Sequence, residues 1–228
     1  MKPVITHPDL VQQVFKSIRD AICDGHFRPG ERLNQDDIAE MLDVSRQPVV
    51  QAIHLLKSQG FARDTGRRGV EVTELGSSET NHYYLIRAAL DGLAAREAAL
   101  RSNGLVQARG AKIIEAGRRA CESGSHHTIV DADMAFHQFI YELSGNPVIS
   151  KTVTPLWHQL RRIMGTAITA DYPVNSIWDE HQTILDAIIE GNTTAAENLA
   201  RAHGETAARR VEHMLRQHEI TESAAGGS

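Results

Sequence analysis

The sequence predicts a mainly α-helical fold that contains one small β-hairpin. Apolar residues recur along most of the chain at the i, i+3, i+4, i+7 spacing of a helix face. A period of two is confined to the segment after Gly60, where Val70 and Val72 alternate with polar residues behind the turn sequence TGRRG. With 41% hydrophobic and 23% charged residues in 228, the composition is that of a folded globular chain.

Cap and turn signals divide the helical pattern into elements and domains. Before the hairpin, helices are expected over residues 9–24, 35–42 and 46–59, with Asn34 and Ser45 as N-caps of the second and third. After the turn-like sequence ELGSS, six more are expected over residues 78–102, 105–122, 129–144, 147–169, 174–190 and 193–218. The predicted organisation is a first domain at 1–75, an all-α domain at 76–218 and a disordered tail at 219–228.

Several classes of protein are disfavoured by the composition. No apolar run approaches the roughly 18 residues that a membrane span needs, and the first residues lack the apolar core of a signal peptide. Cys23 and Cys121 have no C-x-x-C spacing, so neither a disulfide framework nor a thiolate zinc site is expected. We therefore expect a cytoplasmic protein with no membrane partner.

The first domain has the element order of a winged helix-turn-helix. A helix, a short helix, a tight turn, a capped helix and a basic hairpin follow one another, and in such domains the capped helix enters the DNA major groove. The window from Arg46 to Arg68 contains five cations and one anion, although the whole chain has a net charge of −5. This local excess of positive charge suits a DNA backbone.

The predicted DNA contacts come from the start and outward face of the third helix and from the wing. Glutamine can pair with adenine, arginine with guanine or phosphate, and an outward valine can contact a thymine methyl group. The candidates are Ser45, Arg46, Gln47, Val50, Gln51, His54, Arg67, Arg68 and Gly69. An ordinary capped surface helix with solvated arginines would explain any one of these features, but helix order, cap, facing and local charge together favour DNA binding.

In the second domain, titratable residues lie on apolar helix faces. Asp133 and His137 share a stripe with Phe136, while His181 and His203 lie on the apolar stripes of two later helices. One carboxylate and three imidazoles suit a divalent metal such as zinc, nickel, manganese or iron, with room for a water or ligand oxygen. The alternative for each histidine alone is a core imidazole satisfied by a carboxylate or carbonyl.

The N-terminal third resembles a known family of regulators. The sequence from ICDGHFRPGERL to GRRGVEV, with its SR-x-PV helix start, is similar to the winged-helix domain of GntR-type bacterial transcription regulators. That family commonly shows PVREAL where this chain has PVVQAI, so Val50 replaces an arginine that usually contacts DNA and Gln51 replaces a glutamate. The resemblance implies a winged helix with a changed operator preference.

The remaining helices resemble the FadR-like (FCD) branch of the same family. The sequences NHYYLIRAALDG, DADMAFHQFIYELSGNPVI and EHQTILDAIIEGN carry this resemblance across most of residues 78–215. It implies an antiparallel helical bundle whose D-x-x-x-H, H and H metal set falls on Asp133, His137, His181 and His203. It also implies that Arg87 pairs with a small carboxylate effector, whereas an ordinary ion pair with Asp91 at i+4 is the alternative.

The expected function is that of a transcription regulator rather than an enzyme. We expect a homodimeric repressor that binds a pseudo-palindromic operator and responds to a small organic acid held beside a divalent metal, zinc before nickel, manganese or iron. One alternative is a direct metal sensor. Another is a metalloenzyme with a DNA-binding domain, which the absence of H-E-x-x-H and of a general base on the same face disfavours.

Overall fold

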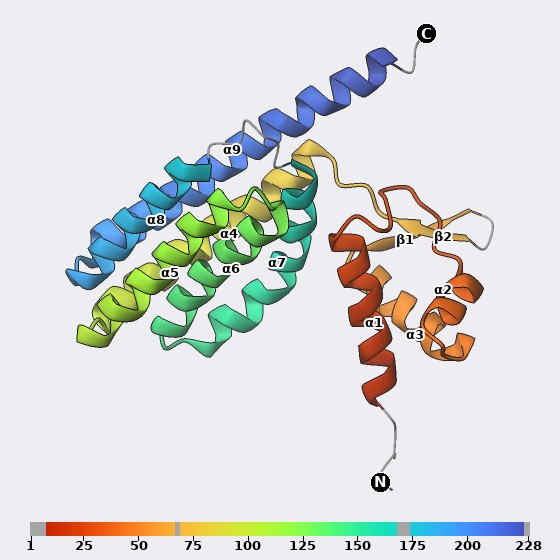
Figure 1. Cartoon of the computed structure of the whole chain (residues 1–228), viewed down its shortest axis with the longest axis horizontal. Helices are drawn as coiled ribbons and strands as arrows, with labels where there is room; N and C mark the ends of the chain where they lie inside the picture. The colour runs from red at the N-terminus through yellow and green to blue at the C-terminus, as the bar shows by residue number, and fades with distance from the viewer. Residues whose placement is uncertain (1–7, 67–68, 168–173, 226–228) are drawn as a thin grey trace, which may run out of the picture. The chain divides into compact units, whose positions relative to one another are not determined.

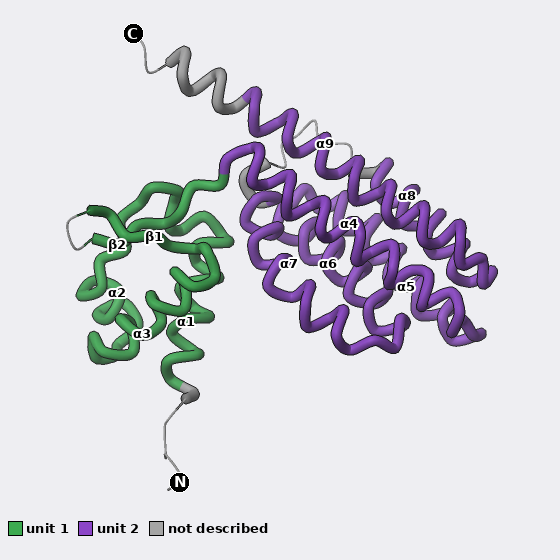
Figure 2. The backbone as a smooth tube through the Cα atoms, turned by 180° about the vertical axis from the view of Figure 1, so that it is seen from behind, with its two compact units in different colours: residues 1–75 green, residues 76–228 purple. Residues whose placement is uncertain are grey.

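A computed structural model of the chain describes residues 8–66, 69–167 and 174–225. The chain divides into two compact units, Met1–Leu75 and Gly76–Ser228 (Figure 2). The structure is 78% helical, which confirms the predicted mainly α-helical class with a two-stranded wing. None of the described helices combines the length and the apolar composition needed to cross a lipid bilayer.

The first unit is a winged helix-turn-helix. Its elements are α1 Pro8–Cys23, α2 Gln35–Met41, α3 Arg46–Ser58, β1 Ala62–Thr65 and β2 Gly69–Val72 (Figure 1). Apolar faces of all three helices and of the hairpin close one core, in which Val49, Ala52 and Leu56 of α3 are fully buried. Asn34 caps α2 by accepting a hydrogen bond from the Asp36 amide at 3.1 Å. Ser45 stands at the predicted N-cap of α3, but its side chain makes no capping hydrogen bond.

The turn between α2 and α3 contains a strained residue. Asp43 has a φ of 50°, in the left-handed region that favours glycine. We expect Asp43→Gly to stabilise the protein by about 1 kcal/mol, because glycine adopts this conformation without steric cost. Asp37→Gly, in the first turn of α2, should destabilise by about 1 kcal/mol, because glycine is a poor helix former and the variant loses a carboxylate that suits the helix dipole. Urea denaturation of both variants checks the prediction, and a loss of stability in Asp43→Gly would contradict it.

The second unit is a bundle of α4 Ser77–Leu100, α5 Gly104–Glu122, α6 His126–Leu143, α7 Pro147–Ala167, α8 Val174–Ile189 and α9 Thr193–Ala225. The long helices α4 and α9 lie side by side and antiparallel (Figures 1 and 2), with Gly204 against Ala88 and Gly92 against Glu197. Small residues allow this approach, since a Cβ added at Gly204 would stand 2.7 Å from the Ala88 Cβ. The close packing fixes the α9 side chains relative to α4.

Some element ends differ from the sequence prediction. The helix expected from residue 129 begins at His126, because the Ser125 side chain accepts a hydrogen bond from the Thr128 amide. The prediction of a disordered tail from 219 is wrong for residues 219–225, which continue α9, because alanine and glutamate favour helix and no glycine or proline lies between Gly204 and Gly226. The predicted helix end at 168–169 and the tail at 226–228 lie outside the described residues.

Candidate functional site

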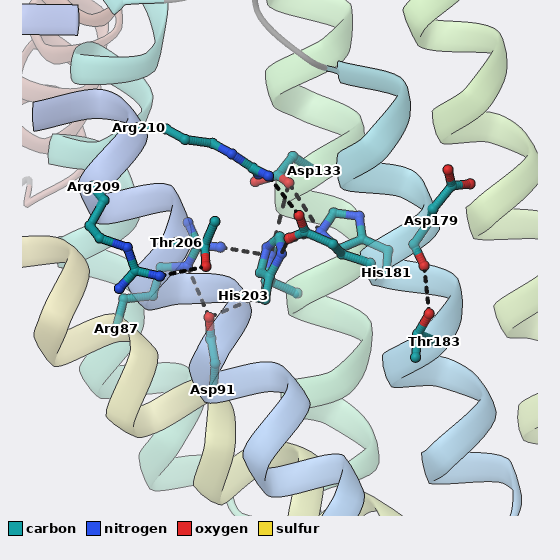
Figure 3. A network of polar contacts seen from close by, with 12 residues as sticks. Arg87, Asp91, Asp133, Asp179, His181, Thr183, His203, Thr206, Arg209 and Arg210 are labelled. Carbon is teal, nitrogen blue, oxygen red and sulfur yellow. Dashed lines mark hydrogen bonds and ion pairs between the residues drawn. The ribbon is translucent and has the colours of Figure 1, made fainter. Parts of the chain in front are cut away.

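Four side chains from three helices meet inside the bundle. Asp133 and His137 lie one turn apart on α6, His181 lies on α8 and His203 on α9, and Figure 3 shows Asp133, His181 and His203 turned toward one another. Each of the four offers one ligand atom, and these atoms all lie within 4.8 Å of one another. All four side chains are buried. The structure therefore brings together the whole predicted metal set.

The spacing of the ligand atoms suits one metal ion. His181 Nε2 lies 3.2 Å from His203 Nε2 and 3.4 Å from Asp133 Oδ1, and His137 Nε2 lies 3.9 Å from the same oxygen. Two ligands bound tetrahedrally at 2.0–2.2 Å from a zinc ion stand about 3.4 Å apart. The Asp133 carboxylate contacts two imidazole nitrogens, those of His181 at 3.4 Å and His137 at 3.9 Å. A buried carboxylate in this state suits a cation better than an apolar core.

A residue that the sequence analysis did not identify orients His203. Glu180 Oε2 accepts a hydrogen bond from His203 Nδ1 at 2.7 Å, while Glu180 Oε1 accepts one from Arg210 at 2.8 Å. With its proton on Nδ1, His203 directs the Nε2 lone pair toward the other ligand atoms. Carboxylate partners of this kind fix the tautomer of metal-binding histidines. No periodicity signal could have found Glu180, because it precedes His181 and lies off the apolar stripe.

On the other side of the cluster, Arg87 joins His137 to Asp91. The Arg87 Nε donates to Asp91 Oδ2 at 3.0 Å, and its NH2 group stands 2.7 Å from His137 Nε2. The guanidinium lies 4.4 Å from the Trp157 ring centroid, and Asp91 also accepts a short hydrogen bond from Tyr141. Arg87, the predicted effector residue, is only 1% exposed. The structure contains the ion pair of Arg87 with Asp91, which the i+4 spacing predicted as the alternative to a contact with a carboxylate effector.

Burial sets the protonation of the ligands. It holds the pKa of His137 and His181 well below the usual value, and nearby Arg87 and His203 act in the same direction. Both rings are therefore neutral, as metal ligands must be. Burial raises the pKa of Asp133, although the charge on Arg87 opposes this shift. A bound divalent cation would favour the ionised form of that carboxylate.

Apolar rings cover the side of the site formed by His181. Phe136 stacks on the His181 ring at a centroid distance of 4.0 Å, and Trp178 meets the same ring edge-on at 4.7 Å. Trp178 fits because Gly117 on α5 has no side chain, since an added Cβ would stand 2.0 Å from the indole. Apolar surroundings of this kind strengthen electrostatic interactions with a bound ion.

The predicted DNA contacts lie at the start and on one face of α3. Ser45, Arg46, Gln47, Gln51 and His54 are exposed, Val50 is half-buried, and Gly69 is buried where β2 begins. Arg67 and Arg68 lie outside the described residues. The outward stripe is thus available to a partner, opposite the buried stripe of α3.

The positive charge of this unit is partly neutralised, by Asp64 within the sequence window and by acidic residues outside it. Lys57 binds Asp64 at 2.8 Å and Arg63 binds Glu71 at 2.7 Å. Arg46 bonds to Gln35 Oε1 at 3.1 and 3.3 Å and lies 3.4 Å from an Asp36 oxygen. The local excess of cations counted from the sequence therefore overstates the charge available to DNA.

A winged helix-turn-helix joined to a helical bundle with a buried cluster of one aspartate and three histidines is the architecture of a class of DNA-binding transcription regulators. Comparison with known families agrees: residues 10–72 match "Bacterial regulatory proteins, gntR family" and residues 82–206 match "FCD domain". The chain belongs to the GntR family of transcription regulators, in its FadR-like (FCD) branch. It is a DNA-binding regulator and not an enzyme, as the sequence predicted.

Individual relatives are distant but cover nearly the whole chain. The chain is 27% identical over 213 residues to the uncharacterized HTH-type transcriptional regulator YdhC of Bacillus subtilis, covering 90% of this chain and 92% of that protein. It is 26% identical to a probable D-xylose utilization operon transcriptional repressor of Paenarthrobacter nicotinovorans, with 87% of each covered. The crystal structure of a putative GntR regulator from Rhodococcus sp. RHA1 matches with a TM-score of 0.74 at 26% identity, over 88% and 96% of the two chains.

Proposed function

We propose that this protein is a homodimeric, ligand-responsive repressor whose bundle holds a divalent metal and a small organic acid. The convergence of four buried ligand atoms within 4.8 Å carries this proposal. Asp133, His137, His181 and His203 would hold the metal. Three nitrogen ligands and one oxygen suit zinc first, with nickel, manganese or iron as alternatives. Lewis acidity is the chemistry that the ion would supply, and it would polarise a carboxylate bound at an open position.

Arg87 is the residue that we assign to the acid. The His137 Nε2 lone pair can accept a hydrogen bond from Arg87 or bind a metal, but it cannot do both. With that lone pair occupied, the Arg87 NH2 group needs another acceptor in a buried environment. A carboxylate oxygen would satisfy it, while Asp91 continues to hold the guanidinium through Nε.

The response to ligand requires a difference in affinity between two arrangements of the protein. An acid that binds more tightly to the DNA-free arrangement than to the operator-bound one weakens DNA binding. The size of the effect is set by that difference in the affinity for the acid. Two winged helices on a two-fold axis would read the two halves of a pseudo-palindrome. As a cytoplasmic repressor, the protein would release its operator when the acid accumulates.

Release of DNA by candidate ligands tests this function against its rivals. Fluorescence anisotropy of a duplex from the region upstream of the protein's own gene is measured with zinc, with a panel of small mono-, di- and tricarboxylic acids, and with both. We expect release only when an acid and the metal are both present. Release by zinc alone would instead indicate a direct metal sensor, and turnover of an acid would indicate a metalloenzyme. The double variant Arg87→Met, Asp91→Leu, which leaves neither charge of this buried pair without its partner, should retain DNA binding and lose the response to acid.

A further inference from the structure

We propose that Arg32, on the segment between α1 and α2, binds a phosphate of the DNA backbone in a hollow between the wing and the start of α3. This contact goes beyond the residues assigned to DNA above, none of which lies on that segment. The hollow has a volume of about 390 Å³. Its polar side chains are those of Arg32, Asn34, Gln35, Asp36 and Arg46, and Gly69 also lines it.

The wing holds the backbone of Arg32 in place. Residues on either side of it hydrogen-bond to β2: the Leu33 amide donates to the Val70 carbonyl at 2.8 Å, and the Val72 amide donates to the Glu31 carbonyl at 2.9 Å. Arg32 itself forms an isolated antiparallel bridge with Glu71. The segment is in effect a third strand beside the wing, and its side chain positions are set by that pairing.

The side chain of Arg32 extends over the first residue of β2. Its Nε and NH2 atoms lie 3.5 and 3.6 Å from the position that a Cβ would occupy at Gly69. These are ordinary contact distances, so the guanidinium lies against Gly69, and Arg32 is an exposed residue. The group that binds phosphate is therefore fixed between two elements, the wing and α3, that approach DNA in winged-helix proteins.

Arg32 also carries the uncompensated charge of the hollow. Among the described residues it forms no ion pair, whereas the second guanidinium, that of Arg46, lies against Gln35 and Asp36. Two cations and one carboxylate leave the hollow with one net positive charge. A phosphodiester carries one negative charge and offers two oxygens, which match the paired N–H donors of a guanidinium.

The position favours a DNA phosphate over a free anion. Arg46 stands at the N-terminal end of the helix that enters the major groove, and Gly69 begins the returning strand of the wing. A strand of DNA that passes from the major groove to the wing has to cross the hollow between them. Backbone contacts of this kind fix the register of a protein on DNA without selecting sequence.

The salt dependence of DNA binding tests the proposal. The probe is a fluorescein-labelled 30-base-pair duplex of random sequence, titrated with wild-type protein, Arg32→Gln and Arg28→Gln between 50 and 200 mM NaCl. Arg28 is an exposed arginine of the same loop outside the hollow, so its variant removes the same charge. We expect Arg32→Gln to reduce the slope of log K against log salt by about 0.9 for each protomer bound, and Arg28→Gln to leave it unchanged.

Sequence independence and a phosphate titration complete the experiment. Arg32→Gln should weaken binding to a second, unrelated duplex by the same factor as to the first. An unchanged slope in Arg32→Gln, or an equal reduction in Arg28→Gln, would overturn the proposal. So would loss of inorganic phosphate binding in Arg32→Gln with DNA binding unaltered, because the hollow would then be a site for free anions. If the wild type bound neither duplex at 50 mM NaCl, DNA binding by this protein and the phosphate contact of Arg32 would both be contradicted.

Discussion

Replacing Asp91 by alanine is expected to destabilise the protein by about 3–5 kcal/mol, the cost of leaving a buried charge without its partner. Arg87 and Asp91 are each about 2% exposed at their side chains, and their Nε–Oδ2 distance is 3.0 Å. Asp91 also accepts from Tyr141, and burial together with the Asp91 charge keeps the pKa of Tyr141 well above its usual value. Alanine at 91 therefore leaves a guanidinium and a hydroxyl without this acceptor. Urea denaturation measures the loss.

Two comparisons separate this cost from a general loss of packing. The double variant Arg87→Met, Asp91→Leu removes both charges at similar volume and should cost only about 1–2 kcal/mol. Asp179→Ala breaks an exposed pair with Arg118, in which the side chains are 69% and 45% exposed, and should cost less than about 1 kcal/mol. If the double variant were as unstable as Asp91→Ala, the buried ion pair would not be the cause.

Replacing Glu180 by glutamine is expected to weaken zinc binding by about 10- to 100-fold. Glutamine retains the shape of the side chain but loses the charge that holds His203 with its proton on Nδ1, at 2.7 Å from Glu180 Oε2. The affinity is measured by competition with a chromophoric chelator. Because the change lies outside the metal ligands, the metal-free variant should keep its fold and its thermal midpoint within a few degrees.

Asp186→Asn provides the matched control for Glu180→Gln. Asp186 lies on the same helix, is exposed and bonds to Gln182 at 2.7 Å, so the same carboxylate-to-amide change is made away from His203. We expect its zinc affinity to equal that of the wild type. Equal affinities in both variants would show that Glu180 does not orient a metal ligand.

The sequence predicted the site residues best where they lie at helix-repeat positions on an apolar face. The apolar stripes of α6, α8 and α9 place Asp133, His137, His181 and His203 inward by periodicity alone, and the bundle then brings them together. Partners that come from other helices left no such signal. Glu180 reaches His203 across α8 and α9, a pairing that depends on how the two helices pack.

Polar pairings also limited the prediction of the DNA-binding unit. The helix order and the outward face of α3 follow from caps and periodicity, but the neutralisation of Arg46 and Arg63 involves residues outside the counted window. In the bundle, the i+4 spacing predicted the pair of Arg87 with Asp91. It did not predict the contacts of Arg87 with His137 and Trp157, because these two residues come from other helices.

The metal content of the purified protein tests the central claim most directly. Plasma mass spectrometry is applied to the wild type, to a His137→Ala, His181→Ala double variant and to a His126→Ala, His127→Ala double variant, each loaded with zinc and dialysed. The second double variant removes the same number of imidazoles from exposed positions. We expect about one ion per chain in the wild type and in the surface variant, and none in the core variant. Absence of metal from all three proteins, or equal content in all three, would contradict a metal site at Asp133, His137, His181 and His203.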